Sequence, residues 1–161
     1  MAEAALRLRD ASFEDLDAVF GLVDQVQSIH VEAEPAFFEP FEKDEAFETW
    51  FKGLLADPNQ YLVLACADGT AIGFLQYYIG LRPRSLFQAE CRLAYVNALV
   101  VAEGHRGSGC GTLLLEHAKQ EARRQGVTQL GIDFWSFNAA ARRCFEKAGF
   151  RVRRETMWQD L

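Results

Sequence analysis

The chain is poor in the residues that build metal centres and disulfide frameworks. It has four cysteines and three histidines among 161 residues. The cysteines stand singly in apolar or helical stretches, without the paired spacing of a zinc site or a disulfide framework. The histidines are also scattered without ligand spacing. We therefore expect no metal site and a reducing compartment.

The sequence also lacks a long apolar run. None approaches the roughly 20 residues that a membrane-spanning helix needs, and the first residues contain no apolar core of signal-peptide length. We expect a cytoplasmic protein with no membrane partner. Internal repeats and low-complexity tracts are absent too, and 161 residues, half of them hydrophobic, suit a single domain over residues 1–161.

Positive charge is scarce in one segment and concentrated in another. Residues 32–48 hold seven acids and one lysine, so this segment carries the whole net charge of −6. Six arginines and lysines crowd the last twenty residues. The overall charge disfavours nucleic acid as a partner. The acids flank Phe37 and Phe38, which suits either a site for a cationic amine or a solubilising face.

Apolar periodicity predicts strands that alternate with helices. Ser12 is expected to cap the first helix, and Trp50 to face inward in the second. The strands are expected at 6–9, 61–67, 70–79, 93–101, 130–134 and 150–158, and the helices at 13–30, 43–56, 110–125 and 138–148. A turn at Asp68-Gly69 joins the second and third strands, and the alternation predicts an α/β or α+β sheet covered on both sides.

The stretch from Leu93 to Thr112 organises the rest. In its first half, the odd and the even positions are both apolar, except for Asn97 and the Tyr95 hydroxyl. This pattern is typical of a central strand that is covered on both faces. Glycines then alternate with small residues at positions 107, 109 and 111, leaving backbone N–H groups unshielded where a helix begins. Such a helix start binds phosphate.

Two nucleotide-binding patterns fit this loop poorly. Gly104 and Gly109 have the spacing of a nucleoside-triphosphate loop, but Cys110 and Gly111 stand where lysine and a hydroxyl residue are needed. For a dinucleotide fold, Thr112 replaces the third glycine, and the acid expected about 20 residues onward, Asp133, falls inside a strand. The dinucleotide interpretation stays as a distant alternative.

A third pattern fits residue by residue. The run Arg106-Gly107-Ser108-Gly109-Cys110-Gly111 resembles the [RQ]xxGx[GA] signature of the GNAT superfamily, the acyl-CoA-dependent N-acyltransferases. Downstream, Asn138, Ala141, Phe145-Glu146 and Gly149-Phe150 are similar to the family's N-x-x-A-x-x-x-[YF]-E-x-x-G-F. The resemblance implies a mixed, mostly antiparallel central sheet splayed between strands four and five, with helices on both faces.

The resemblance also implies how acetyl-CoA binds. Pantetheine would lie in the splay along the backbone of residues 99–101, and the amides of residues 106–112 would hold the diphosphate. Arg106 either contacts phosphate or satisfies the loop, and Asn138 points toward pantetheine or caps a helix. The implied cofactor-binding residues are Leu99, Val100, Val101, Arg106, Gly107, Ser108, Gly109, Cys110, Gly111, Thr112, Asn138 and Phe145.

The residues that would move protons depart from the family pattern. Many members use a glutamate on the central strand as base and a tyrosine on the last helix as acid, whereas this chain has Asn97 near the first position and Phe145 at the second. Asn97 can orient a water but cannot act as a base, and Tyr95 can replace the missing hydroxyl. Both are also compatible with structural roles, as a satisfied polar residue and a core aromatic.

We therefore expect an N-acetyltransferase that moves acetyl from acetyl-CoA to a primary amine of a small molecule or peptide by direct attack in a ternary complex. The alternative is a catalytically weak acyl-CoA-binding regulatory module, motivated by the missing acid and base. The sequence does not specify the acceptor, although the acidic segment suits a cationic amine. A homodimer is compatible with the resemblance.

Overall fold

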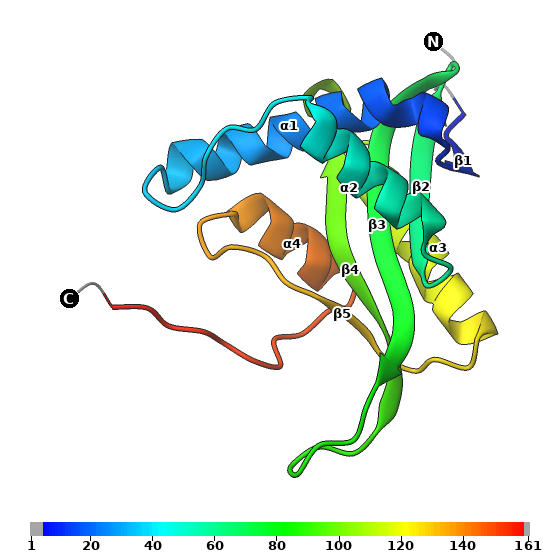
Figure 1. The fold of residues 1–161 in the computed structure, drawn as a ribbon, viewed down its shortest axis with the longest axis vertical. Coiled ribbons are helices and arrows are strands. Elements are labelled where there is room, and N and C mark those ends of the chain that lie inside the picture. Colours follow the sequence, from blue (N-terminus) through cyan, green and yellow to red (C-terminus); the bar gives the residue numbers. More distant parts are fainter. Residues whose placement is uncertain (1–4, 160–161) are drawn as a thin grey trace.

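The computed structural model describes residues 5–159 and is built around one five-stranded sheet (Figure 1). The strand order is β1-β2-β3-β4-β5. The strands span Arg7–Asp10 (β1), Gln60–Ala67 (β2), Thr70–Arg82 (β3), Cys91–Val101 (β4) and Leu130–Ile132 (β5). The first four pair antiparallel with their neighbours, and β5 pairs parallel with β4.

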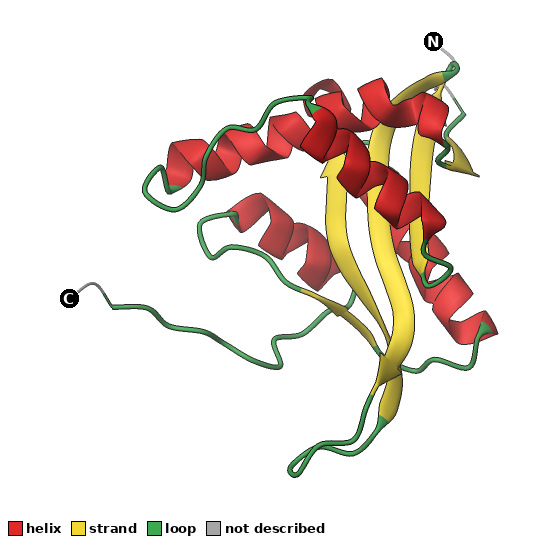
Figure 2. Cartoon of the chain, in the orientation of Figure 1, coloured by secondary structure: helices red, strands yellow, loops and turns green. Residues whose placement is uncertain are grey.

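Four helices cover the sheet on its two faces (Figure 2). They are α1 (Leu16–Ala33), α2 (Glu45–Ala56), α3 (Cys110–Arg124) and α4 (Ala139–Lys147), with short 3-10 turns at Phe13–Asp15 and Glu103–His105. One core joins α1 and α2 to the sheet through side chains such as Val19 and Phe51. The other joins α3 and α4 through Leu114, Leu115 and Phe145. The expected mixed sheet with helices on both faces is confirmed, and no described helix is long and apolar enough to cross a membrane.

A bulge in β4 decides where the sheet opens. Gln76 pairs with Ala98 and Tyr77 with Val96, so Asn97 is an extra residue without a partner on β3. The bulge reverses the alternation of β4: Val96 packs on the α3–α4 side, whereas Val100 packs on the α1–α2 side. Pairing with β5 stops at Val96, one residue before the bulge. Beyond it, the outer edge of β4 has no strand partner within residues 5–159.

Several local predictions are confirmed. Asp68 and Gly69 both have positive φ, 48° and 81°, as a two-residue hairpin turn of the primed type requires. Gly126 follows α3 with φ of 72°, the left-handed conformation that ends helices. Asn138 caps α4, its side chain accepting a hydrogen bond from the Ala141 N–H at 2.9 Å.

Two expectations were wrong. Residues 150–158 form no strand: Phe150 packs on the core, and residues 151–159 are extended and exposed. A strand needs a neighbour, and the apolar positions of this segment are too interrupted by arginines to pull it onto the sheet. Trp50 is 40% exposed because Phe47 and Phe51 fill the space under α2. The expected capping sequence at Ser12 is present as a capping box with Asp15, whose carboxylate accepts from the Ser12 N–H at 2.8 Å.

An ion pair holds β1 to the start of α1. The Asp15 carboxylate accepts from the Arg9 guanidinium at 2.6 and 2.7 Å and from the Ser12 N–H at 2.8 Å. Asp15 is buried, and the hydrogen bond from Arg9 outweighs burial, lowering the pKa of Asp15 to about 2. A carboxylate with a depressed pKa stabilises the fold above its ordinary pKa and stops doing so below its folded value.

We predict that the wild-type protein loses on the order of 2 kcal/mol of unfolding free energy from this group as pH falls from about 4 to about 2. Asp15→Asn should remove that part of the pH dependence and lower stability at neutral pH. Urea denaturation at several pH values measures both. Asp17→Asn is the control, because the Asp17 side chain is 81% exposed; equal pH profiles for wild type and Asp15→Asn would contradict the assignment.

Candidate functional site

The loop between β4 and α3 presents a row of bare backbone amides. Gly107 and Gly109 have φ of 82° and 86°, and α3 begins at Cys110 without a side-chain cap. In the part of the chain that the structure describes, the N–H groups of Gly107 and of residues 109–112 have no hydrogen-bond acceptor. Converging amides at the positive end of a helix dipole fit a diphosphate. The loop therefore fits the phosphates of CoA as the sequence predicts.

Small residues let this loop sit close to the sheet. A Cβ atom on Gly73 of β3 would lie 2.7 Å from the Cys110 sulfur, so only glycine there allows the start of α3 its position. A Cβ on Gly111 would contact both Val101 of β4 and Cys144 of α4 at 3.6–3.7 Å. The loop thus lies where β4, α3 and α4 meet.

Side chains around the loop tie it to its neighbours. The Glu103 N–H donates to the Gln25 side chain of α1 at 3.0 Å. The Arg106 guanidinium donates to the Val101 carbonyl at 3.4 Å, so its side chain folds back onto the end of β4. This contact corresponds to the role in which Arg106 satisfies the loop, and its contact with phosphate stays a prediction.

The two catalytic candidates lie on either side of the opening of the sheet. Asn97 is the bulged residue and is exposed. Tyr95 lies two residues earlier, directly opposite Gly131 of β5, with its ring near that of Tyr78 at 6.1 Å. Burial and the nearby Asp133 carboxylate raise the pKa of Tyr95, which keeps its hydroxyl protonated at neutral pH.

The remaining predicted residues divide between the rim and the core. Leu99 and Val101 pack partly against the α3–α4 core. Asn138 uses its side-chain oxygen to cap α4. Phe145 is 6% exposed and packs between Phe134 and Phe150, so it belongs to the core.

Burial raises the pKa of Cys110 and of Cys144, so both thiols stay protonated. The described residues contain no group of three metal-ligating side chains.

Sequence reasoning missed an aromatic cluster that joins two loops across the opening. His30 stacks on Phe38 at 4.9 Å and meets Phe137 edge-on at 5.7 Å. Trp135 contacts Phe37 and Phe38 at 5.1 and 4.9 Å. Burial lowers the pKa of His30, favouring a neutral imidazole. The density of aromatics at 37–38 and 134–137 is the signal that could have indicated this cluster.

Carboxylates share the α1–α2 loop with Phe37 of the aromatic cluster. Phe37 is 63% exposed and lies in the α1–α2 loop with Glu34, Glu39 and Glu42, which are exposed too. A hollow of about 220 Å³ between α1 and this loop is lined by Asp24 and Glu32 among other residues. A separate hollow of about 380 Å³ lies at the other end of α3, beside Lys119 and Arg123, and is not part of this site.

Comparison with known proteins agrees with this geometry. Residues 24–150 match the model of the acetyltransferase (GNAT) family. Streptothricin acetyltransferase from Streptomyces lavendulae is 29% identical over 122 residues, which are 74% of this chain and 60% of that protein, so the match spans less than two thirds of that relative. A mutant of the BH1408 protein from Bacillus halodurans superposes with a TM-score of 0.90 at 21% identity, covering 96% of this chain and 99% of that one.

One further solved structure is informative because of what it contains. AAC(6')-Iy, in complex with the bisubstrate analog CoA-S-monomethyl-acetylneamine, superposes with a TM-score of 0.77 at 17% identity. The superposition covers 98% of this chain and 99% of that one. At this identity the similarity shows a shared fold.

Gly131 gives the first prediction at the site. A Cβ there would lie 2.5 Å from the Tyr95 ring, so Gly131→Ala must displace the ring or part β4 from β5. We expect a loss of about 1–3 kcal/mol in unfolding free energy, measured by urea denaturation. Gly104→Ala, where a Cβ meets nothing within 4 Å, should stay within about 0.5 kcal/mol of the parent. Equal stabilities for the two variants would contradict this packing.

Proposed function

Because this chain belongs to the GNAT acetyltransferase family, we propose that it transfers the acetyl group of acetyl-CoA to the primary amine of a small, positively charged molecule. The observation that carries the proposal is the row of bare amides at the start of α3 beside the unpaired edge of β4. Acetyl-CoA supplies the acetyl group as an activated thioester. Its diphosphate and its extended amide arm are the two features that such a pair of elements recognises.

The amides of Gly107 and residues 109–112 donate hydrogen bonds to the phosphates. They lie at the N-terminus of α3, where the helix dipole is positive, so they need no basic side chain. The edge of β4 from Asn97 to Val101 is free to hydrogen-bond an extended amide chain, as a sheet edge does with an added strand. A backbone N–H of this edge also provides the donor that would stabilise negative charge on the reacting oxygen.

The reaction exchanges the bond from the acetyl carbon to sulfur for one to nitrogen. The amine loses one proton, and the CoA sulfur gains one, so atoms and charge balance. An alkylammonium titrates near pKa ~10, so a base or a water must remove its proton at neutral pH. We assign the orientation of such a water to Asn97, which is exposed at the bulge, and the donation of a proton to the Tyr95 hydroxyl, which is protonated at neutral pH.

The charge of the acceptor is inferred from the α1–α2 loop. Exposed carboxylates attract a cation over several ångströms and raise its local concentration. The faces of Phe37, Phe38 and Trp135 lie within that field, and aromatic faces bind cations by about 0.5–1 kcal/mol each when exposed. A cationic amine is therefore the acceptor that this surface favours. The relative named streptothricin acetyltransferase is in line with a small acceptor.

A panel of amines tests the proposal. With acetyl-CoA present, we expect thiol release that depends on a cationic primary amine and yields one N-acetylated product per thiol, measured by thiol titration and mass spectrometry. CoA should also raise the unfolding free energy, by about 2.7 kcal/mol at a hundred times its Kd. Binding of CoA without amine-dependent thiol release would overturn the proposed activity in favour of a regulatory CoA-binding module.

Two variants at Gly109 form a matched pair for the phosphate loop. Both Gly109→Asp and Gly109→Asn place a side chain at positive φ, with a shared cost of about 1–3 kcal/mol in stability. Only the aspartate adds negative charge at the amides. Gly109→Asp should therefore lose both activity and the stabilisation by CoA, while Gly109→Asn keeps part of each. Equal stabilisation of the two variants by CoA would place the diphosphate elsewhere.

The aromatic cluster gives a separate prediction. Phe37→Ala should raise KM for the preferred amine about threefold or more, with kcat and the KM for acetyl-CoA little changed, because only the acceptor would touch this ring. Trp50→Ala is the control, since Trp50 is an exposed aromatic on α2 that lies outside the cluster. Steady-state kinetics with each substrate varied measure the effects, and an unchanged KM for the amine in Phe37→Ala would remove Phe37 from the acceptor site.

A further inference from the structure

His30 is a half-buried imidazole whose ring nitrogens remain accessible. Its ring stacks on Phe38 at 4.9 Å and meets Phe137 edge-on at 5.7 Å. Its nitrogens make no hydrogen bond with a residue that the structure describes, and neither nitrogen is itself buried. Polar groups of partly buried side chains normally find a partner. An imidazole that is packed by rings but open at its nitrogens is therefore available to a ligand.

The position of His30 follows from the way α1 crosses the end of β4. The Gln25 side chain accepts from the Glu103 N–H at 3.0 Å, just beyond β4, and Val26 packs on the core beneath α1. His30 lies one turn after Val26 and therefore on the same face of the helix. Its contact with Phe137 joins this face to the β5–α4 loop. His30 thus lies between the end of β4 and the segment that continues β5, where the sheet opens (Figure 1).

The side chains that contact the His30 ring are uncharged. Phe38 approaches from the α1–α2 loop, and Phe137 approaches from the β5–α4 loop. The charged groups next to these contacts along the chain are carboxylates, namely Glu34 one turn further along α1, Glu39 beside Phe38, and Asp133 at the start of the β5–α4 loop. Burial lowers the pKa of His30 from its ordinary 6.5. The ring is therefore neutral at pH 7 and able to accept a proton.

We propose that His30 is the general base that takes the proton from the ammonium group of the acceptor. The inference rests on the proposed acetyl transfer and names the residue that this reaction needs for deprotonation. A general base accepts its proton directly or across one water. The water assigned to Asn97 therefore links the ammonium to His30.

Atoms and charge balance in this sequence of steps. An N–H bond of the ammonium breaks and one forms on the imidazole, which becomes imidazolium and later releases the proton to solvent. The neutral amine then attacks the acetyl carbon, the bond from that carbon to sulfur breaks, and the second amine proton reaches the sulfur through the Tyr95 hydroxyl. One ammonium and one acetyl-CoA give one N-acetyl amide, one CoA thiol and one free proton.

The pH dependence of kcat/KM for the best amine of the panel tests the role of His30. In the parent, kcat/KM should be level between the His30 pKa, which lies below 6.5, and the amine pKa of about 10, and should fall tenfold per pH unit on the acid side. His30→Phe keeps a ring against Phe38 and Phe137 but has no nitrogen. Its kcat/KM should be about a hundredfold lower at pH 7 and should rise tenfold per pH unit up to the amine pKa, because only the neutral amine then reacts.

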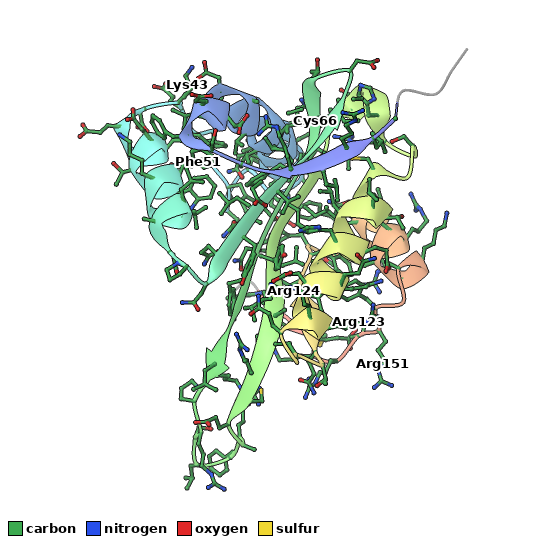
Figure 3. The ribbon with its side chains drawn as sticks, turned by 90° about the vertical axis from the view of Figure 1, so that its right-hand side faces the viewer. Lys43, Phe51, Cys66, Arg123, Arg124 and Arg151 are labelled. Atoms are coloured by element: carbon green, nitrogen blue, oxygen red, sulfur yellow. The ribbon has the colours of Figure 1, made fainter. Side chains whose placement is uncertain are left out.

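His117→Phe is the matched control. His117 is a half-buried histidine of α3, the helix that carries Arg123 and Arg124 at its end and lies across the sheet from α2 with Phe51 (Figure 3). The same exchange there should leave the pH profile unchanged. A parent that acetylates no amine overturns the proposed function itself. A parent that acetylates amines with the same pH profile as His30→Phe overturns only the role of His30.

An NMR titration examines the same site without turnover. The imidazole resonance of His30, identified by its loss in His30→Phe, should titrate below pH 6.5. Adding the amine together with CoA, which has no acetyl group to donate, should lower that pKa further, because a bound cation disfavours the imidazolium. A His30 pKa that a saturating amine leaves unchanged would place the base elsewhere and overturn the inference.

Discussion

The single extra residue at Asn97 is the constraint on which the site depends. In a strand without a bulge, side chains alternate strictly between the two faces of the sheet, and the pairing with β5 could continue. The bulge instead turns Val96 toward α3 and Val100 toward α1, so β4 serves both cores in sequence. It also coincides with the end of the β4–β5 ladder. The edge of β4 without a strand partner among the described residues therefore begins at the change in register and leads to the glycine loop.

The glycines in and around the phosphate loop have two different roles, close packing and backbone conformation. Gly73 is needed for the close packing of α3 against β3 and has no positive φ, whereas a Cβ on Gly111 would make only ordinary contacts with β4 and α4. Gly107 and Gly109 have open space around them and supply left-handed conformations that turn successive amides the same way. The amides lie in water-accessible positions, so leaving them unpaired costs little until an anion replaces the water.

What could be predicted from the sequence was local. The glycine loop, the Asp68-Gly69 turn and the Asn138 cap each depend on a few adjacent residues with strong conformational preferences. The bulge could not be predicted, because it is a relation between two strands and leaves no mark on the apolar pattern. The cluster of His30, Phe37 and Trp135 brings together residues about a hundred positions apart. The expected last strand failed for the same reason, because whether a segment becomes a strand depends on a partner elsewhere.

The distribution of charge also bears on turnover. Acetylation converts a cationic amine into a neutral amide, so the acidic loop would attract the substrate and lose its hold on the product. The absence of a glutamate on β4 is consistent with this arrangement. A carboxylate at position 97 would bind the substrate ammonium at the reacting centre and raise the pKa of that ammonium, so its deprotonation would be harder. In the proposed reaction, acids at the rim and a neutral amide at the bulge would separate attraction of the cation from its deprotonation.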